Sequence, residues 1–67
     1  MVLEGTQILT EPFHEWCERN GYRATKVDTS CSGLMCVEWY RLREPDGFSF
    51  DVNVTTTNTG TTISRRS

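Results

Sequence analysis

Residues 48–54 read FSFDVNV, in which large apolar and polar side chains alternate strictly. Because successive side chains of a β-strand point to opposite faces, this alternation predicts a strand with one apolar face. The stretch LMCVEWYRLR at 34–43 is rich in strand-forming residues, and YRATKVD at 22–28 suits a further strand. The segment TSCSG between these two favours a loop.

The segment EPDG at 44–47 predicts a tight turn, with Pro45 entering a type I turn and Gly47 in the left-handed conformation. This turn fixes a register in which one face carries Leu42 by Phe50, Tyr40 by Val52 and Glu38 by Val54. The other face carries Arg43 by Ser49, Arg41 by Asp51, Trp39 by Asn53 and Val37 by Thr55. A slip by one residue would place arginines opposite phenylalanines, so the pattern favours this register.

A short amphipathic helix is predicted upstream of the strands. Thr10 suits the N-cap, with Glu11 and Pro12 in the first turn, and Gly21 suits the end. One helical face is formed by Phe13, Trp16, Cys17 and Asn20.

The sequence therefore predicts a single α+β domain over 1–67, with one short helix packed on a small antiparallel sheet of three strands in the order α-β-β-β. The threonine-rich segment 55–67 forms either a fourth strand or a frayed tail, and residues 2–9 form either an edge strand or coil. The expected core contains Phe13, Trp16, Cys17, Cys36, Tyr40, Leu42, Phe48, Phe50, Val52 and Val54.

A chain of 67 residues buries only a marginal core. Domains of this size usually need a disulfide, a bound metal or a partner subunit to be stable. No apolar run approaches the roughly 18 residues of a membrane span, and a signal peptide is not recognisable, so we expect a cytoplasmic protein without membrane contact. The net charge of −2 disfavours nucleic-acid binding, because proteins that bind nucleic acid usually carry a basic stripe on their surface. The odd number of cysteines, three, favours reduced thiols.

Four side chains offer zinc-compatible ligands, namely His14, Cys17, Cys31 and Cys36. The alternative that we favour makes Cys17 and Cys36 small buried hydrophobes, Cys31 a loop thiol and His14 a solvated helix residue. A disulfide between Cys31 and Cys36 is the third alternative. We therefore expect neither a metal nor another cofactor.

Catalytic residues are not predicted. A cysteine nucleophile needs a base within hydrogen-bond reach, and the single histidine lies beside a cysteine that points to the core. A glycine loop for phosphates and a nucleotide motif are both missing from the sequence. We expect the protein not to be an enzyme.

The run ERNGY at 18–22, the strands that follow, EPDG at 44–47 and FDVNV at 50–54 resemble the layout of HicA-type messenger-RNA interferase toxins, which are small double-stranded-RNA-binding-like domains. The resemblance covers about two thirds of the chain. A histidine near the start of the family's second strand cleaves RNA, whereas the matching stretch here is Ser32-Gly33-Leu34-Met35. The family's second helix is also missing. The resemblance therefore implies nucleic-acid binding without cleavage.

The favoured function is a small protein-binding module, acting as an inhibitor, adaptor or accessory protein of the kind common in phages and mobile elements. On the predicted sheet, the face turned away from the helix carries Met35, Val37 and Trp39, rimmed by Arg41 and Arg43. Exposed apolar patches often bind a protein partner or a second copy of the chain. Alternatively, the N-terminal or threonine-rich segment folds over this face.

A rival function is nucleic-acid binding. In that case Trp39 stacks on a base, and phosphates are contacted by Arg23, Arg41, Arg43, Arg65 and Arg66.

Overall fold

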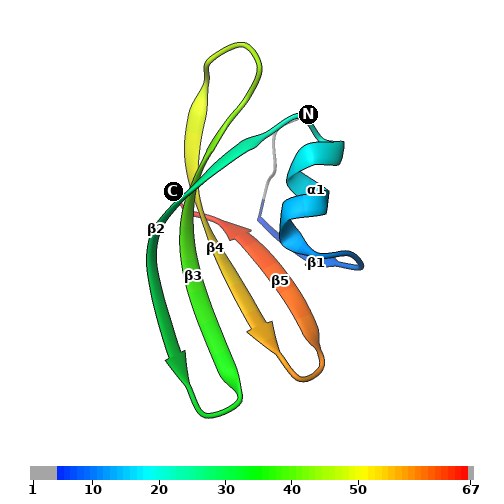
Figure 1. The fold of residues 1–67 in the computed structure, drawn as a ribbon, viewed down its shortest axis with the longest axis vertical. Coiled ribbons are helices and arrows are strands. Elements are labelled where there is room, and N and C mark those ends of the chain that lie inside the picture. Colours follow the sequence, from blue (N-terminus) through cyan, green and yellow to red (C-terminus); the bar gives the residue numbers. More distant parts are fainter. Residues whose placement is uncertain (1–4, 67) are drawn as a thin grey trace.

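The computed structural model describes residues 5–66 and contains one helix and five strands within them. In chain order these are β1 (Thr6–Leu9), α1 (Phe13–Arg19), β2 (Arg23–Ser32), β3 (Met35–Arg43), β4 (Ser49–Thr57) and β5 (Gly60–Arg65). The strands form one antiparallel sheet in the order β1-β5-β4-β3-β2. The helix covers one face of this twisted sheet (Figure 1).

This architecture corrects the predicted fold class. The prediction of three or four strands in the order α-β-β-β is wrong, because a strand precedes the helix and the threonine-rich segment adds another. Threonine is β-branched and favours strands even where large apolar residues are scarce. Ile63 lies in β5 and is fully buried, so one apolar side chain anchors that strand in the core. The run α1-β2-β3-β4 keeps the helix and three strands of the HicA-type layout, but β1 precedes this run and β5, instead of a second helix, follows it.

The helix begins later than predicted. Pro12 occupies the N-cap position and Thr10 lies outside the helix, because Phe13 is the first residue with helical geometry. Proline is accepted here since the first N–H groups of a helix have no internal partner. At the other end Gly21 adopts φ = 77°, and the Tyr22 N–H donates to the carbonyl of Cys17 at 2.8 Å. The glycine thus ends the helix as predicted.

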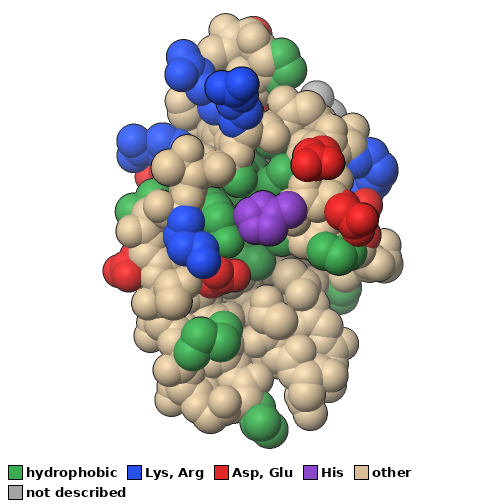
Figure 2. All heavy atoms as spheres, viewed as in Figure 1, with side chains coloured by type: hydrophobic (Ala, Val, Ile, Leu, Met, Phe, Trp, Pro, Cys, Tyr) green, Lys and Arg blue, Asp and Glu red, His purple; other side chains and the backbone are tan. Residues whose placement is uncertain are grey.

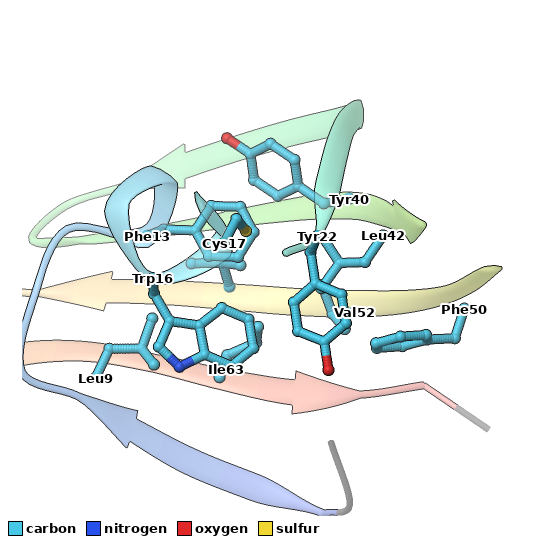
Figure 3. Packing of buried hydrophobic residues seen from close by; sticks show 11 residues of the cluster. Leu9, Phe13, Trp16, Cys17, Tyr22, Tyr40, Leu42, Phe50, Val52 and Ile63 are labelled. Atoms are coloured by element: carbon cyan, nitrogen blue, oxygen red, sulfur yellow. The ribbon is translucent and has the colours of Figure 1, made fainter. Parts of the chain in front are cut away.

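Aromatic contacts join the helix to the sheet. The rings of Phe13 and Tyr40 lie 4.6 Å apart, and those of Trp16 and Tyr22 lie 5.4 Å apart. Tyr22 in turn meets Phe50 edge to face at 5.6 Å. Figure 3 shows these side chains filling the space between α1 and the sheet. The buried cluster comprises Leu9, Phe13, Trp16, Cys17, Tyr22, Tyr40, Leu42, Phe50, Val52, Val54 and Ile63.

Two members of the expected core lie elsewhere. Phe48 is 47% exposed, because it belongs to the turn before β4 and only borders Phe50. Cys36 is only partly buried, because it lies near the hairpin end beyond the reach of the helix. Leu9, Tyr22 and Ile63 occupy the core instead.

The β3–β4 hairpin confirms the predicted register pair by pair, from Arg43 opposite Ser49 to Val37 opposite Thr55. Gly47 has φ = 97°, and its N–H donates to the carbonyl of Glu44 at 2.9 Å. The neighbouring β2–β3 hairpin is longer than predicted, because TSCS continues β2 instead of forming a loop. Its register shifts between Lys26 and Asp28, which leaves Val27 as an extra residue in a bulge.

Candidate interaction surface

One face of the sheet packs against α1, and we name the other the open face. Its residues follow from the strand registers. They are Arg23, Thr25, Asp28, Ser30 and Ser32 on β2, Met35, Val37, Trp39, Arg41 and Arg43 on β3, Ser49, Asp51, Asn53, Thr55 and Thr57 on β4, Thr62 and Ser64 on β5, and Thr6 and Ile8 on β1.

All five residues predicted to bind a partner lie together on the open face. Met35 is 47% exposed, Val37 and Trp39 are half-buried, and Arg41 and Arg43 are exposed. Each is two residues from the next, so they form a row along β3 with roughly 6.7 Å between neighbours. Residues 5–66 provide no second layer over this row, since β1 and β5 extend the sheet sideways instead of folding across it. The alternative in which the N-terminal or threonine-rich segment folds over this face is therefore wrong for the described residues.

The arginines gather at one end of the open face. Arg23 and Arg43 are direct cross-strand partners, and Arg41 is the next residue of the row. The Arg41 Nε donates to Asp51 Oδ1 at 3.1 Å. Just after β5, the Arg66 N–H donates to the carbonyl of Asp51 at 2.9 Å, which brings a fourth arginine to this end.

Arg65 does not belong to this group. It pairs with Val52, which faces the helix, and its guanidinium lies 5.8 Å from the Phe48 ring and 5.0 Å from the Phe50 ring. Because side chains alternate along β5, Arg65 points to the helix side and contacts aromatic rings there. It therefore cannot join the proposed phosphate contacts of the open face. Of the five arginines named for nucleic acid, Arg23, Arg41 and Arg43 lie on the open face, and Arg66 lies beside its arginine end just after β5.

Beyond the arginines, beginning with the cross-strand row of Trp39, the open face is rich in hydroxyl groups and carries Asp28 opposite Trp39. Thr6 Oγ1 and Ser64 Oγ lie 2.9 Å apart and share a hydrogen bond. Asn53 is opposite both Trp39 and Ser64, and its Oδ1 is buried without a hydrogen-bond partner. A buried acceptor without a donor costs stability, so this position is not optimised for folding.

A hollow of about 470 Å³ lies at the arginine end, between the turn after α1 and the β3–β4 turn. Arg23 and Arg43 line it together with Glu44 and Asp46. Two guanidinium groups and two carboxylates give it a mixed charge, and we assign it no ligand of its own. Asp46 Oδ1 is already engaged, because it accepts the Phe48 N–H at 2.9 Å.

The four zinc-compatible residues do not assemble. Cys31 and Cys36 are cross-strand partners and form a disulfide with Cα atoms 4.0 Å apart, which removes both as thiolate ligands. Cys17 is buried in the core, and this burial raises the pKa of its thiol to about 12, so it stays protonated. His14 is exposed on the helix side (Figure 2). Residues 5–66 hold no cluster of three or more His, Cys, Asp or Glu side chains suited to a metal.

The disulfide also corrects the expectation of three reduced thiols. Only Cys17 is free. The expected cytoplasmic location disfavours this pairing, and the sequence predicts Cys31 in a loop, whereas the extended β2 brings it directly opposite Cys36.

Two cations on the helix side of the molecule have carboxylate partners. Lys26 Nζ lies 2.7 Å from Glu38 Oε2, and Arg19 pairs with Glu11. The hydrogen bond and charge of Lys26 lower the pKa of Glu38, with the Tyr40 hydroxyl also donating to it at 3.3 Å. These bonds explain how Glu38 is accommodated next to the apolar face.

No family model matches the chain, and neither a curated protein nor a solved structure is similar to it. Among the described residues, no helix has the length and apolar character needed to cross a membrane.

Proposed function

We propose that this protein is a small binding module that docks on a protein partner through the open face of its sheet. It then acts as an inhibitor, adaptor or accessory protein, and its role contains no catalytic step. The observation that carries the proposal is that Trp39 and Val37 remain only half-buried, with Met35 exposed beside them. Apolar groups left on a surface in this way gain free energy when a partner removes them from water.

The composition of the face supports a protein interface. Aromatic residues, methionine and arginine are enriched at such interfaces, and all three occur within the single row on β3. Trp39 sits at the middle of the row, between the apolar side chains and the arginines. Tryptophan and arginine are also the residues most often found as hot spots of binding.

The compartment is part of the proposal. A cytoplasmic location follows from the sequence expectation, but the Cys31–Cys36 disulfide argues for an oxidising compartment. In a reducing cytoplasm we expect the same pair as two thiols on neighbouring strands. Alkylation of freshly lysed cells, followed by mass measurement, counts the free thiols and distinguishes the two locations.

Capture experiments with a tagged protein test the proposed function. The tagged chain is incubated with a lysate of its source organism, and bound proteins are compared between the unmodified chain, Trp39→Ala and Leu34→Ala. Leu34 is the matched control, because it is 80% exposed but lies at the tip of the β2–β3 hairpin, outside the row. We expect Trp39→Ala to lose the partner at a cost of roughly 2 kcal/mol or more in binding, and Leu34→Ala to retain it.

Sizing of the purified chain across a concentration series covers the case in which the partner is a second copy. Partner binding, or self-association, that is unaffected by Trp39→Ala would contradict the proposal. Circular dichroism of each variant verifies that the fold is intact.

A further inference from the structure

The open face concentrates arginines that lack ion-pair partners. Arg23 and Arg43 on this face, and Arg66 beside it just after β5, form no ion pair within residues 5–66. Arg23 and Arg43 are moreover directly opposite each other on neighbouring strands. Like charges opposed in this way destabilise a sheet. Glu44 and Asp46 line the same hollow but form no ion pair with either guanidinium.

This arrangement contrasts with the helix side, where Lys26 and Arg19 each have a carboxylate. The arginine pair is therefore not explained by the internal stability of the fold. A carboxylate supplied from outside would offset the repulsion, and an arginine can bind it with two parallel hydrogen bonds.

The same face combines this charge with an apolar part. Trp39 and Val37 continue the row that begins with Arg43 and Arg41, and no basic residue of the open face lies beyond Arg41 toward the hairpin tip. The surface thus has one basic end, whereas the rest of it is apolar and rich in hydroxyl groups. A matching occupant needs negative charge at one end and a large apolar side chain at the other.

We propose that the occupant is an acidic segment of a partner protein, with carboxylates over Arg23 and Arg43 and an apolar side chain over Trp39. The inference rests on the proposed function and names the chemistry of its partner. Charge complementarity of this kind sets the orientation and the association rate of a complex.

The charges of the face favour this occupant over nucleic acid. Asp51 lies among the arginines, and Asp28 is directly opposite Trp39. A nucleic-acid strand stacked on Trp39 would carry its phosphates past both carboxylates, whereas a basic groove normally tracks the whole backbone. A protein segment needs its negative charge only at the arginine end.

Binding of synthetic probes, followed by NMR of the ¹⁵N-labelled protein, tests the inference. The first probe is a short peptide that alternates Glu with Leu, the second replaces every Glu by Gln, and the third is oligothymidylate. We expect the Glu peptide to shift the Trp39 indole N–H and the amides of Arg23 and Arg43. We expect the Gln peptide to bind roughly tenfold more weakly or worse, a difference of about 1.4 kcal/mol.

A matched pair of variants tests the site of binding. Arg43→Gln and Arg19→Gln each remove one exposed positive charge, but Arg19 lies on the helix side. We expect the affinity for the Glu peptide to fall several-fold in Arg43→Gln and to stay unchanged in Arg19→Gln.

Three outcomes would overturn the inference. Equal affinity for the Glu and Gln peptides would remove the acidic requirement. Tighter binding of oligothymidylate, weakening steeply with salt, would identify nucleic acid as the occupant. Absence of binding by every probe, while Trp39→Ala still abolishes capture from the lysate, would refute the acidic partner and leave the proposed function standing. If Trp39→Ala leaves capture intact, the proposed function itself fails.

Discussion

The two faces of this sheet are built from alternate residues of the same strands, yet they have different physical roles. On β3, Tyr40 and Leu42 are buried under the helix, whereas Trp39 and Arg41 on the open face are half-buried and exposed. All buried apolar residues of the described chain belong to the helix side. The difference shows that one short helix suffices to form the core, so the core does not require the residues of the open face.

The largest test of this difference compares the two tryptophans. Trp16 is 5% exposed and packs against Tyr22, so Trp16→Ala should destabilise the protein by about 3–5 kcal/mol. Trp39→Ala should cost much less, because Trp39 is not covered by a second layer within residues 5–66. Urea unfolding followed by circular dichroism measures both.

Equal destabilisation by the two variants would contradict the distinction between the faces. It would mean that Trp39 is covered within the folded chain, and the open face could then not serve as a binding surface.

The sequence predicts the β3–β4 hairpin and the composition of the row on β3 well. The strict alternation of FSFDVNV and the EPDG turn together allow a single register, and every pair of it is observed. The five predicted binding residues are alternate residues of one strand. They therefore all lie on the same face of the sheet once this register is set. The buried helix residues Phe13, Trp16 and Cys17 follow equally from local spacing.

The remaining features depend on contacts that are distant in sequence. β5 has only Ile63 as a large apolar residue, and β1 joins the sheet by pairing with β5, so neither strand has a clear local pattern. Arg23 joins the candidate site only because β2 pairs with β3. The disulfide requires β2 to extend to Ser32, against the loop signals of TSCSG.

The second test concerns the Cys31–Cys36 disulfide, which closes the end of the β2–β3 hairpin away from the helix. Replacing both cysteines by serine should lower the free energy of unfolding by roughly 2 kcal/mol, since a short loop gains the least from cross-linking. The helix-side core should remain intact. Thermal unfolding with and without reductant gives the same comparison for the unmodified protein. A variant that loses its near-ultraviolet circular dichroism would show that the core also depends on this bond.

Glu38 on the helix side is expected to make a smaller, pH-dependent contribution to the free energy of unfolding. The pKa of Glu38 is lowered in the folded state, mainly by Lys26. The resulting stabilisation is therefore complete above the ordinary carboxyl value of 4.5 and is lost as the pH falls through the lower folded value. Because the Lys26 and Glu38 side chains are 52% and 26% exposed, it should amount to no more than about 1 kcal/mol.

Urea midpoints measured from neutral to acidic pH compare Glu38→Gln with Asp51→Asn, which removes the Arg41 ion pair of the open face. We expect Glu38→Gln to flatten the acid-induced loss of stability more than Asp51→Asn does, since the Arg41 and Asp51 side chains are 63% and 44% exposed. An identical response of both variants would show that the two faces do not differ in their electrostatic coupling.

The smallest expected change in the free energy of unfolding concerns Asn53 on the open face. Its Oδ1 is buried without a hydrogen-bond partner, and it lies opposite Trp39. Asn53→Thr removes this acceptor and introduces a residue with a higher strand propensity, as in the neighbouring Thr55. We expect unfolding stability to stay within about 0.5 kcal/mol of the unmodified protein or to rise. A loss above about 1 kcal/mol would show that Asn53 makes a stabilising contact in solution, and that the open face contributes to folding as well as to binding.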